Sequence, residues 1–346
     1  MKIGAPTARS LIRLCMIGLL GGVVVVTIFD AVSDLHVWRG LANLARPHPP
    51  AVASNPDLPQ LTGHRVSWVT DIHDQRISES SGLTVSALHS GVLYTVNDSG
   101  NDPILFALDE SGHTLAELEL SVTAADIEAM DAYTDAEGAH ILVADVGDNL
   151  RWRPHIWLHI FAEPAVLNDQ QLDLSRSIQV SLPNGPRDIE AVAIDHPRNR
   201  ILLLSKRHYP PELFSIPLSA SGAVTAMQLQ DFPTWPRPTA LDLERNATGG
   251  QYKYMPGGMD IAGQHLLITT YKPLLLIDLA RPQEPPRWID MPEIGQREAI
   301  SFVSGSDRVA LFTRERSRTK GYADVFRIEL PANLADHTAA SATPPR

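Results

Sequence analysis

The amino-acid sequence predicts an all-β fold, a five-bladed β-propeller. The apolar runs of the chain are short and separated by turn residues, which favours strands over long helices. The motif Asp-Ile-Glu-Ala occurs twice, beginning at Asp126 and at Asp188, and an apolar residue follows it each time. The strand-like runs also group in fours, and four-stranded units that recur about every 40 to 60 residues are the signature of a propeller.

The N-terminus predicts a membrane segment. Lys2, Arg9 and Arg13 precede Leu14–Phe29, a run of 16 uncharged and mostly apolar residues. This run is at the short edge of what spans a bilayer, and the positive flank is expected to stay in the cytoplasm. We therefore expect residues 1–32 to be a single-pass anchor in a bacterial inner membrane, with the C-terminal domain in the periplasm. The alternative is a cleaved signal peptide, although "FDAVSDL" offers only a poor cleavage site.

The composition of the rest of the chain sets the domain boundaries. Residues 33–61 predict a juxtamembrane segment and a linker, because Arg46–Gln60 contains five prolines. The propeller is expected at residues 62–331 and a disordered tail at residues 332–346. The net charge of −11 argues against binding to nucleic acid, since proteins that bind it normally carry a basic face.

Aligned on the Asp-Ile-Glu-Ala motif, the chain divides into five units. The fifth unit lacks a fourth strand, and His64–Ile72, "HRVSWVTDI", is the natural donor. An N-terminal strand that completes the last blade would close the ring. Pro233–Pro256 is interpreted as an insertion, and six blades are the alternative if it holds another blade. The first strands of the units are expected at residues 79–88, 126–133, 188–195, 257–263 and 297–303.

The repeated motif places acidic side chains on one face of the first strand. Side chains alternate between the two faces of a strand, so Asp126 and Glu128 share a face, as do Asp188 and Glu190. Because the first strand of a blade lines the central channel, we expect an acidic ring at one mouth of that channel. The equivalent positions in the first and fifth units hold Glu79, Ser81, Gln296 and Glu298.

The second strands are expected to add polar groups at the same mouth. Each runs antiparallel to the first strand, so its end lies beside the start of that strand. The fourth unit adds no acid in phase, because Gly257 and Met259 stand there and Asp260 is out of phase. The ends of the second strands carry Asn97, Asp145, Lys206, Tyr271 and Arg314, with Asp98, Arg207, Lys272 and Glu315 beside them.

Two interpretations of this acidic mouth remain open. Clustered carboxylates cannot all stay ionised without a cation or basic partners. The first interpretation is a hard-cation site that suits Ca²⁺, which takes six to eight oxygen ligands. The second is structural, with the acids paired to Lys206, Arg207 and Arg314 or bonded to backbone amides. The ligands of the Ca²⁺ site would be Glu79, Glu128, Glu190 and Glu298, with Asn97 or Asp145.

Several motifs together carry a resemblance to a known family. They are, in order, "VNDSGNDPILFALD", "ADVGDNLRWR", "DIEAVAID", "LLLSKR", "GGMDIAG" and "REAISF", and they lie between Glu79 and Leu330. As a set they resemble the bacterial exported propellers known as esterase-like phytases or quorum-regulated propeller proteins. The acidic ring is more distantly similar to that of the gluconolactonase propellers, whose channel holds a divalent cation. The resemblance implies an envelope propeller that hydrolyses phosphoesters or esters.

Three functions are compatible with the sequence. The first is a binding module for a small anionic ligand or an envelope protein partner. The second is a metal-dependent hydrolase of phosphoester, lactone or ester bonds, with Glu128 or Glu190 as general base. In that case Lys206 and Arg314 would stabilise anionic charge. The third is a scaffold in an envelope assembly. The expected ligand-binding residues are Asn97, Asp98, Asp126, Asp145, Asp188, Lys206, Arg207, Tyr271 and Arg314.

Two motifs that would point to other chemistry are missing from the sequence. No Gly-rich loop able to cradle a phosphate is visible, so we expect no nucleotide or organic cofactor. No Gly-x-Ser-x-Gly elbow occurs either, which disfavours a serine hydrolase of the usual kind.

Overall fold

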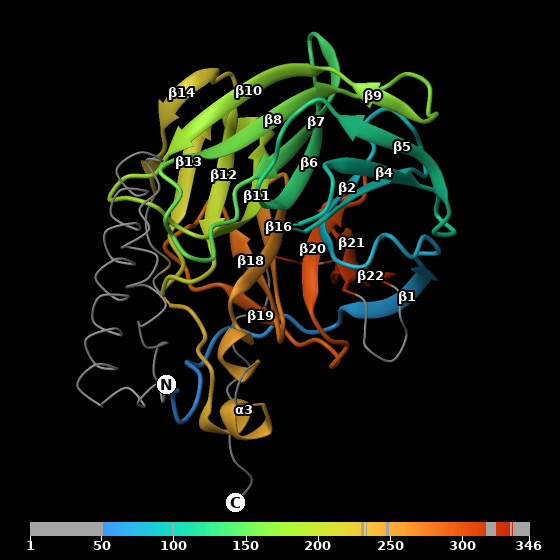
Figure 1. The fold of residues 1–346 in the computed structure, drawn as a ribbon. Coiled ribbons are helices and arrows are strands. Elements are labelled where there is room, and N and C mark those ends of the chain that lie inside the picture. The colour runs from blue at the N-terminus through green and yellow to red at the C-terminus, as the bar shows by residue number, and fades with distance from the viewer. Residues whose placement is uncertain are drawn as a thin grey trace, which may run out of the picture.

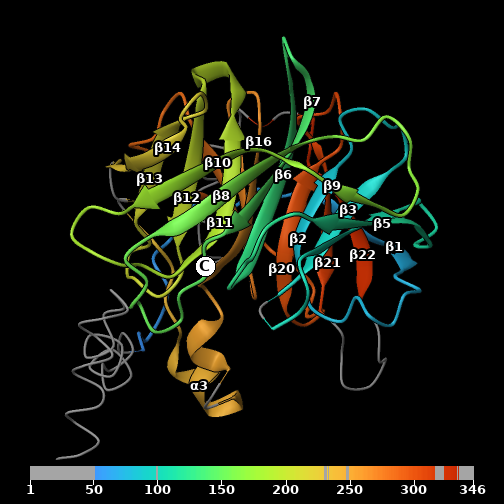
Figure 2. The same cartoon turned by 45° about the horizontal axis from the view of Figure 1, so that its top comes forward.

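A computed structural model describes residues 51–98, 100–229, 232, 234–246, 249–315, 323–332 and 334. These residues form five sheets arranged as blades around a central channel, and the four strands of each blade run antiparallel (Figures 1 and 2). The prediction of five blades is therefore confirmed. Blade 1 contains β2 (Ser80–Val85), β3 (Leu93–Asn97), β4 (Ile104–Leu108) and β5 (Thr114–Leu120). Blade 2 contains β6 (Ile127–Asp135), β7 (Gly138–Asp145), β8 (Ile156–Ala162) and β10 (Leu174–Ser181).

The remaining blades have the same order of strands. Blade 3 contains β11 (Ile189–Asp195), β12 (Arg200–Ser205), β13 (Leu213–Pro217) and β15 (Met227–Gln228). Blade 4 contains β16 (Pro256–Ala262), β17 (His265–Thr270), β18 (Leu274–Asp278) and β19 (Arg287–Ile289). Blade 5 contains β20 (Arg297–Phe302), β21 (Val309–Arg314), β22 (Asp324–Glu329) and β1 (Arg65–Asp71). A short 3₁₀ helix, η1 (His196–Arg198), joins β11 to β12.

The N-terminal strand closes the ring as the sequence predicted. β1 pairs antiparallel with β22, from Arg65 opposite Glu329 to Asp71 opposite Asp324. The first and last strands of the propeller thus share one sheet, and their pairing closes the ring.

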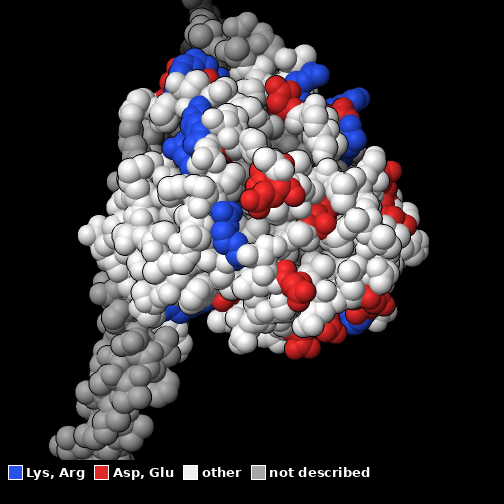
Figure 3. Space-filling model, turned by 90° about the horizontal axis from the view of Figure 1, so that it is seen from above, with Lys and Arg blue, Asp and Glu red and all other residues white. Residues whose placement is uncertain are grey.

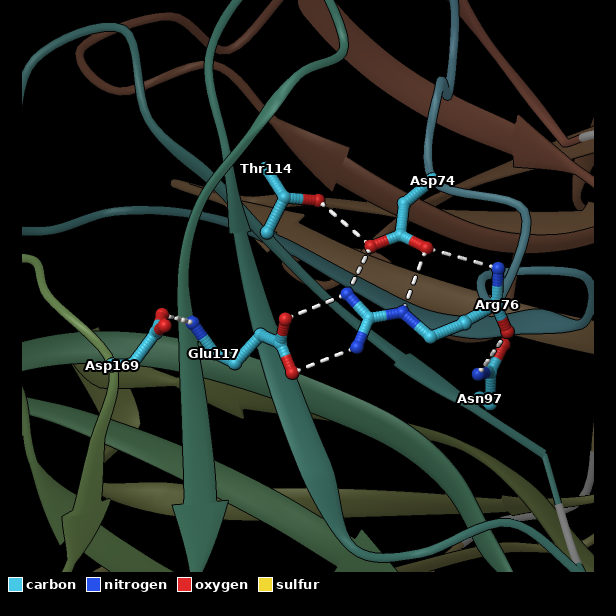
Figure 4. Close-up of polar contacts among 6 residues, drawn as sticks. All are labelled: Asp74, Arg76, Asn97, Thr114, Glu117 and Asp169. Carbon is cyan, nitrogen blue, oxygen red and sulfur yellow. Dashed lines mark hydrogen bonds and ion pairs between the residues drawn. The ribbon is translucent and has the colours of Figure 1, made fainter.

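The connection from β1 to β2 is held by a network around Arg76 (Figure 4). The Arg76 guanidinium lies 2.6 Å from Asp74 Oδ2 and 2.6 Å from Glu117 Oε1. Asn97 Nδ2 donates to the Arg76 carbonyl at 2.8 Å, and the Glu117 amide donates to Asp169 Oδ1 at 2.9 Å. Because the Arg76 side chain is 56% exposed, these ion pairs mainly fix the path of the crossover and contribute little stability each.

Two blades are extended by a strand that the next blade supplies. β9 (Gln170–Leu172) leaves blade 2 between β8 and β10 and pairs in parallel with β5 of blade 1. β14 (Gly222–Thr225) leaves blade 3 in the same place and pairs in parallel with β10 of blade 2. The outer edges of blades 1 and 2 are therefore covered, which removes a row of unpaired backbone groups.

The apolar core lies between the blades. One cluster of buried aliphatic and aromatic side chains occupies each of the five interfaces between neighbouring blades. Tyr94, Phe161, Phe214 and Phe312 are among the largest fully buried side chains. Such burial is worth about 1.5 to 3 kcal/mol for a large apolar side chain, so these interfaces hold the ring together.

The Pro-rich segment is packed against the propeller where the structure describes it. The Trp288 amide donates to the Pro59 carbonyl at 2.8 Å, and the Leu61 amide donates to the Trp288 carbonyl at 2.8 Å. Leu58 and Leu61 are buried. A linker was expected here from the prolines, but these two leucines give the segment an apolar side that packs along blade 4.

The stretch expected to be an insertion joins blade 3 to blade 4. It contains α3 (Ala240–Arg245) and the 3₁₀ helix η2 (Gly250–Tyr252). Thr239 and Asp242 form a capping box at the start of α3. Asp242 Oδ1 also accepts from Lys272 Nζ at 2.9 Å, which ties the insertion to the loop after β17.

The predicted membrane segment, residues 1–32, lies outside the described residues, as does most of the predicted tail. Among the helices that the structure does describe, none is long and apolar enough to cross a bilayer.

Candidate functional site

Each inner strand of the propeller is interrupted near its start by a β-bulge. The register shifts by one residue in blades 1 to 4, and in blade 5 the irregularity also includes Ala299. A bulge leaves a residue unpaired and re-aims its side chain. The residues at the bulges are Ser81, Glu128, Glu190, Gly257 and Glu298. All except the glycine line one cavity of about 290 Å³ at this mouth of the channel.

Blade 4 contributes no side chain at its bulge because there is no room for one. A Cβ on Gly257 would lie 2.8 Å from Glu298 Oε2 and 2.8 Å from the Arg297 carbonyl oxygen. The glycine therefore makes space for the carboxylate of Glu298. Asp260, which the sequence placed out of phase, lies farther along β16 and lines a different cavity.

In four blades, the residue of the second strand that reaches this cavity directly follows the last residue paired with the first strand. The last pairs join Ser80 to Asn97, Ile189 to Ser205, Pro256 to Thr270 and Arg297 to Arg314. The next residues, Asp98, Lys206, Tyr271 and Glu315, line the cavity. Sequence alignment had placed Asn97 and Arg314 in this role, one residue too early.

Four residues expected at the site form their hydrogen bonds or ion pairs with residues that do not line the cavity. Arg314 pairs with Asp324 on β22. Asn97 bonds to the Arg76 carbonyl, and Asp145 lies 3.0 Å from the Arg153 guanidinium. The Glu79 amide donates to Asn97 Oδ1 at 3.3 Å. Of these four, none lines the cavity: Glu79, Asn97, Asp145 and Arg314.

Three carboxylates converge on the side of blades 1 and 2. Asp98, Asp126 and Glu128 each place one carboxylate oxygen within 4.8 Å of the others. Gly147 leaves the space between two of them, because a Cβ there would lie 2.4 Å from the Asp126 carboxyl group and 2.8 Å from Glu128 Oε1. Hard oxygen donors in a cradle of this kind fit a Ca²⁺ ion, with water completing the coordination.

Lys206 lines the cavity beside Glu190 and Tyr271. Its Nζ donates to Glu190 Oε2 at 2.7 Å and lies 5.8 Å from the centre of the Tyr271 ring. Tyr271 in turn donates its hydroxyl hydrogen to Glu298 Oε1, to which Gln296 Nε2 also donates at 3.4 Å. The Glu190 carboxylate of blade 3 is therefore bonded to the Lys206 ammonium group, and the Glu298 carboxylate of blade 5 to the Tyr271 hydroxyl.

Arg207 forms the wall of the cavity on the side of blades 2 and 3. Its Nε donates to Asp188 Oδ2 at 2.6 Å, and a terminal nitrogen donates to Asn149 Oδ1. The guanidinium lies 5.3 Å from the centre of the Tyr252 ring. Asp188 also accepts from the Asp148 amide at 3.0 Å, so this acid is part of the wall rather than the cavity.

The charges at this mouth shift one another's titration. Burial raises the pKa of Glu190 to about 8, against the opposing effect of Lys206 and with help from Asp188 and Glu298. Burial, Glu298 and Asp98 raise the pKa of Glu315 to about 8. Burial and Glu190 also raise the pKa of Glu128 well above its usual range. Burial alone would lower the pKa of Lys206, but the surrounding carboxylates outweigh it and raise that pKa.

Two cavity residues could not be identified from the sequence pattern. Tyr252 comes from η2 in the insertion, and Asn149 comes from the loop after β7. Neither belongs to a repeated strand position. The motif that contains Asn149, "VGDN", has the turn formers of a loop, but such residues do not reveal which way a loop folds.

A second cavity of about 490 Å³ lies at the other end of the channel. Its lining includes Asp131 of β6 and Asp260 of β16. Asp131 accepts from the amides of Ala132 and Ile194, both at 2.7 Å. Figure 3 views the molecule from the side of the β6–β7 turn, and on this face acidic and basic side chains are interspersed.

Asp260 repeats this arrangement between blades 4 and 5. It accepts from the amides of Ile261 and Phe302, both at 2.6 Å. Ser301 Oγ similarly accepts from the Val85 amide of blade 1 at 3.3 Å. The acids of this second mouth therefore join neighbouring blades through backbone hydrogen bonds.

Comparison with known proteins finds likeness of fold only. The chain matches no protein-family model and no curated protein sequence. Solved structures similar to it include a gluconolactonase from Xanthomonas campestris, with 11% identity, 83% of this chain and 99% of that chain covered and a TM-score of 0.45. A glutaminyl cyclase from Myxococcus xanthus has 12% identity, with 77% and 97% covered and a TM-score of 0.45.

A luciferin-regenerating enzyme gives a similar result, with 11% identity, 79% of this chain and 96% of that chain covered and a TM-score of 0.44. The distant likeness to gluconolactonases is thus one of architecture. The resemblance to esterase-like phytases and quorum-regulated propellers stays a prediction.

Proposed function

We propose that this propeller binds a small anionic or oxygen-rich ligand at the channel mouth, together with a divalent cation. The observation that carries the proposal is the convergence of Asp98, Asp126 and Glu128, whose carboxylate oxygens lie within 4.8 Å of one another. Ca²⁺ is the ion that best suits three flexible oxygen ligands and added water.

The charge balance of the cavity supports a cation. Acidic groups outnumber basic ones in its lining, and Arg207 is already bonded to Asp188. Buried carboxylates without a counter-charge either take up protons or bind a cation. A divalent ion on the side of blades 1 and 2 would supply such a counter-charge to Glu128, whose pKa burial raises.

Polar groups opposite the three acids suit the ligand. Ser81, Asn149 and Gln296 line the same cavity and offer neutral hydrogen-bonding groups, while Lys206 offers positive charge. Every residue that lines this cavity carries a polar or charged group, which suits a charged or oxygen-rich ligand rather than an apolar one. An anionic group would therefore meet the cation on one side and Lys206 on the other.

A second candidate function is hydrolysis of a phosphoester, lactone or ester. It is favoured by Glu190, whose pKa burial raises to about 8, because a carboxyl group that titrates near neutral pH can exchange protons with a substrate. Glu190→Gln should then abolish turnover while leaving binding intact. If the wild-type protein binds a ligand without turning it over, the binding module is supported. If it shows neither binding nor turnover and tolerates Glu190→Gln, a scaffold is favoured.

The location of the protein is part of the proposal. The basic and apolar N-terminus supports a periplasmic propeller tethered to the inner membrane, with a cleaved exported form as the alternative. In that setting the partner would be a small anionic ligand or an envelope protein. Labelling of an introduced cysteine by a membrane-impermeant maleimide in whole cells and in lysed cells would test it.

The first experiment is thermal melting of the purified protein during titration with Ca²⁺. An ion held only by the folded state stabilises it by about 2.7 kcal/mol at a concentration 100 times its Kd, so the melting temperature should rise. Glu128→Gln should remove most of this rise. Glu119→Gln, which makes the same charge change on the exposed face of β5, should leave it intact. No rise with Ca²⁺ or any other divalent ion would overturn the proposal.

A further inference from the structure

The insertion between blades 3 and 4 supplies one wall of the cavity. Tyr252 of η2 lines it, and the Arg207 guanidinium lies 5.3 Å from the centre of the Tyr252 ring. The same guanidinium bonds to Asp188 and Asn149, so the ring completes the surroundings of a cavity cation. The shape of this wall therefore depends on how the insertion is held.

Within the insertion, α3 fixes the position of η2. Asp242 Oδ2 accepts from the Tyr254 hydroxyl at 3.2 Å and from the Thr239 amide at 2.9 Å. The start of η2 packs directly on this turn, because a Cβ on Gly250 would lie 2.3 Å from the Asp242 carbonyl oxygen. Tyr252 stands between Gly250 and Tyr254, so its position follows that of α3.

The Pro-rich N-terminal segment holds the residues at the start of α3. The Val52 amide donates to the Pro238 carbonyl at 2.9 Å, and the Val52 carbonyl accepts from the Ala240 amide at 3.3 Å. Farther along the segment, Asn55 Oδ1 accepts from the Arg237 amide at 2.6 Å. Two backbone bonds and one side-chain bond therefore fix the entry to α3.

The other end of this segment is fixed to blade 4. Leu58 and Leu61 are buried, and Gln60 pairs in parallel with Trp288 of β19. Prolines in the segment and in the stretch before α3 restrict φ on both sides of the contact, so less conformational freedom is lost when they pack. A segment fixed to a blade at one end can hold the insertion at the other.

We infer that residues 52–61 are a strap that positions the ligand site, with Asn55 as a positioning residue. The inference rests on the proposed ligand site at this mouth, because the strap itself does not line the cavity. Its effect reaches the cavity through the entry to α3, and then through Asp242 to the Tyr252 ring. Release of the strap should therefore shift this ring relative to Arg207 and change the shape of the site.

The inference is tested with a single 3-fluorotyrosine at position 252, whose ¹⁹F resonance reports the surroundings of that ring. Asn55→Ala removes the acceptor of the Arg237 amide, so the resonance should move by more than its linewidth. Val52→Pro removes the amide that bonds to Pro238 and should also move it, and this variant serves if the first fails to fold. If Asn55 served stability alone, the melting temperature would fall and the resonance of the folded protein would stay in place.

Gln60→Ala is the matched control. Gln60 is an exposed amide of the same strap and donates to the Leu58 carbonyl at 3.4 Å rather than to the insertion, so the resonance should not move. Asn55→Asp keeps an oxygen acceptor for the Arg237 amide and should also leave the resonance at its wild-type position.

An unmoved resonance in both Asn55→Ala and Val52→Pro would overturn the inference. An equal movement in Gln60→Ala would overturn it as well, because any change in the strap would then have the same effect. A Ca²⁺ titration without a rise in the melting temperature would instead refute the proposed cation site, so the two failures are distinct.

Discussion

The two mouths of the channel use the same chemical group in different ways. At one mouth, Asp131 and Asp260 each accept two backbone N–H groups and join neighbouring blades. At the other, Glu190 accepts from the ammonium of Lys206, and Glu298 accepts from the Tyr271 hydroxyl. All four acids lie on inner strands, and β6 carries an acid of each mouth, Glu128 and Asp131.

The difference shows how local geometry assigns a role to a buried acid. Beyond the bulge the strand is regular, and the short side chains of Asp131 and Asp260 accept hydrogen bonds from amides of the next blade. At the bulge the side chain is turned into the channel, and the longer glutamates reach other side chains across it. Backbone partners hold an acid for the fold, whereas side-chain partners and cations leave it available to a ligand.

The largest effect on stability is expected from Asp260→Ala. The change leaves the buried Phe302 amide and the partly buried Ile261 amide without their partner, at a cost of about 1 to 3 kcal/mol for a buried group and less for a partly buried one. Urea denaturation should show a loss of about 1 to 5 kcal/mol, with Ca²⁺ affinity of the folded protein unchanged. Glu128→Gln should show the reverse pattern. A loss below about 1 kcal/mol in Asp260→Ala would contradict this division between the mouths.

A smaller and more local effect is expected from Gly147→Ala. The new Cβ would press on the Asp126 and Glu128 carboxyl groups, which are ends of flexible side chains and can move. Ca²⁺ affinity measured by calorimetry should fall by about tenfold or more, because ligand geometry sets the affinity of such sites. Unfolding should change by no more than about 1 kcal/mol, as expected when few contacts are lost.

Gly112→Ala is the control for that substitution. Its Cβ would lie 2.0 Å from the Asp71 carbonyl oxygen, and its φ of 82° disfavours a side chain, so it should destabilise the fold. Its effect on Ca²⁺ affinity should be negligible. Equal affinity losses in the two glycine variants would mean that Gly147 acts through the fold alone.

The last expected effect is a dependence of stability on pH, to which two glutamates of the site mouth contribute. The pKa values of Glu190 and Glu315 are raised by burial to about 8 from an ordinary 4.5. Between these values the folded state binds more protons than the unfolded chain, so the free energy of unfolding falls as pH rises. A bound cation displaces those protons, so stabilisation by Ca²⁺ should grow over the same interval.

Melting curves from pH 5 to 8.5, with and without Ca²⁺, would measure both trends. Glu315→Gln should flatten the curve recorded without Ca²⁺. A melting temperature that rises with pH through this interval in the cation-free protein would show that the carboxyl groups are already ionised.

Much of the architecture could be predicted from the sequence because it follows from repetition. The period of the strands gave five blades, and the missing fourth strand identified His64–Ile72 as the closing one. The motif also placed Glu128, Glu190 and Glu298 at one mouth, where the structure has them.

The ends of the second strands were placed less well, because the last pair of a strand depends on register across the sheet and not on the apolar pattern along the chain. The alignment chose Asn97 and Arg314, which belong to last pairs, and named Asp98 and Glu315, which reach the cavity, only as their neighbours. Tyr252 was missed for another reason. It stands in an insertion whose position depends on contacts such as Lys272 with Asp242, which no local pattern encodes.

The five bulges also bear on how such a ring could arise by duplication. A unit copied together with its bulge presents one side chain to the same mouth in every copy, before any selection on that side chain. The side chain at the bulge can then differ from blade to blade, as Ser81 and Gly257 do from the three glutamates. The apolar contacts between blades are untouched by such changes, so the chemistry of the mouth can evolve independently of the fold.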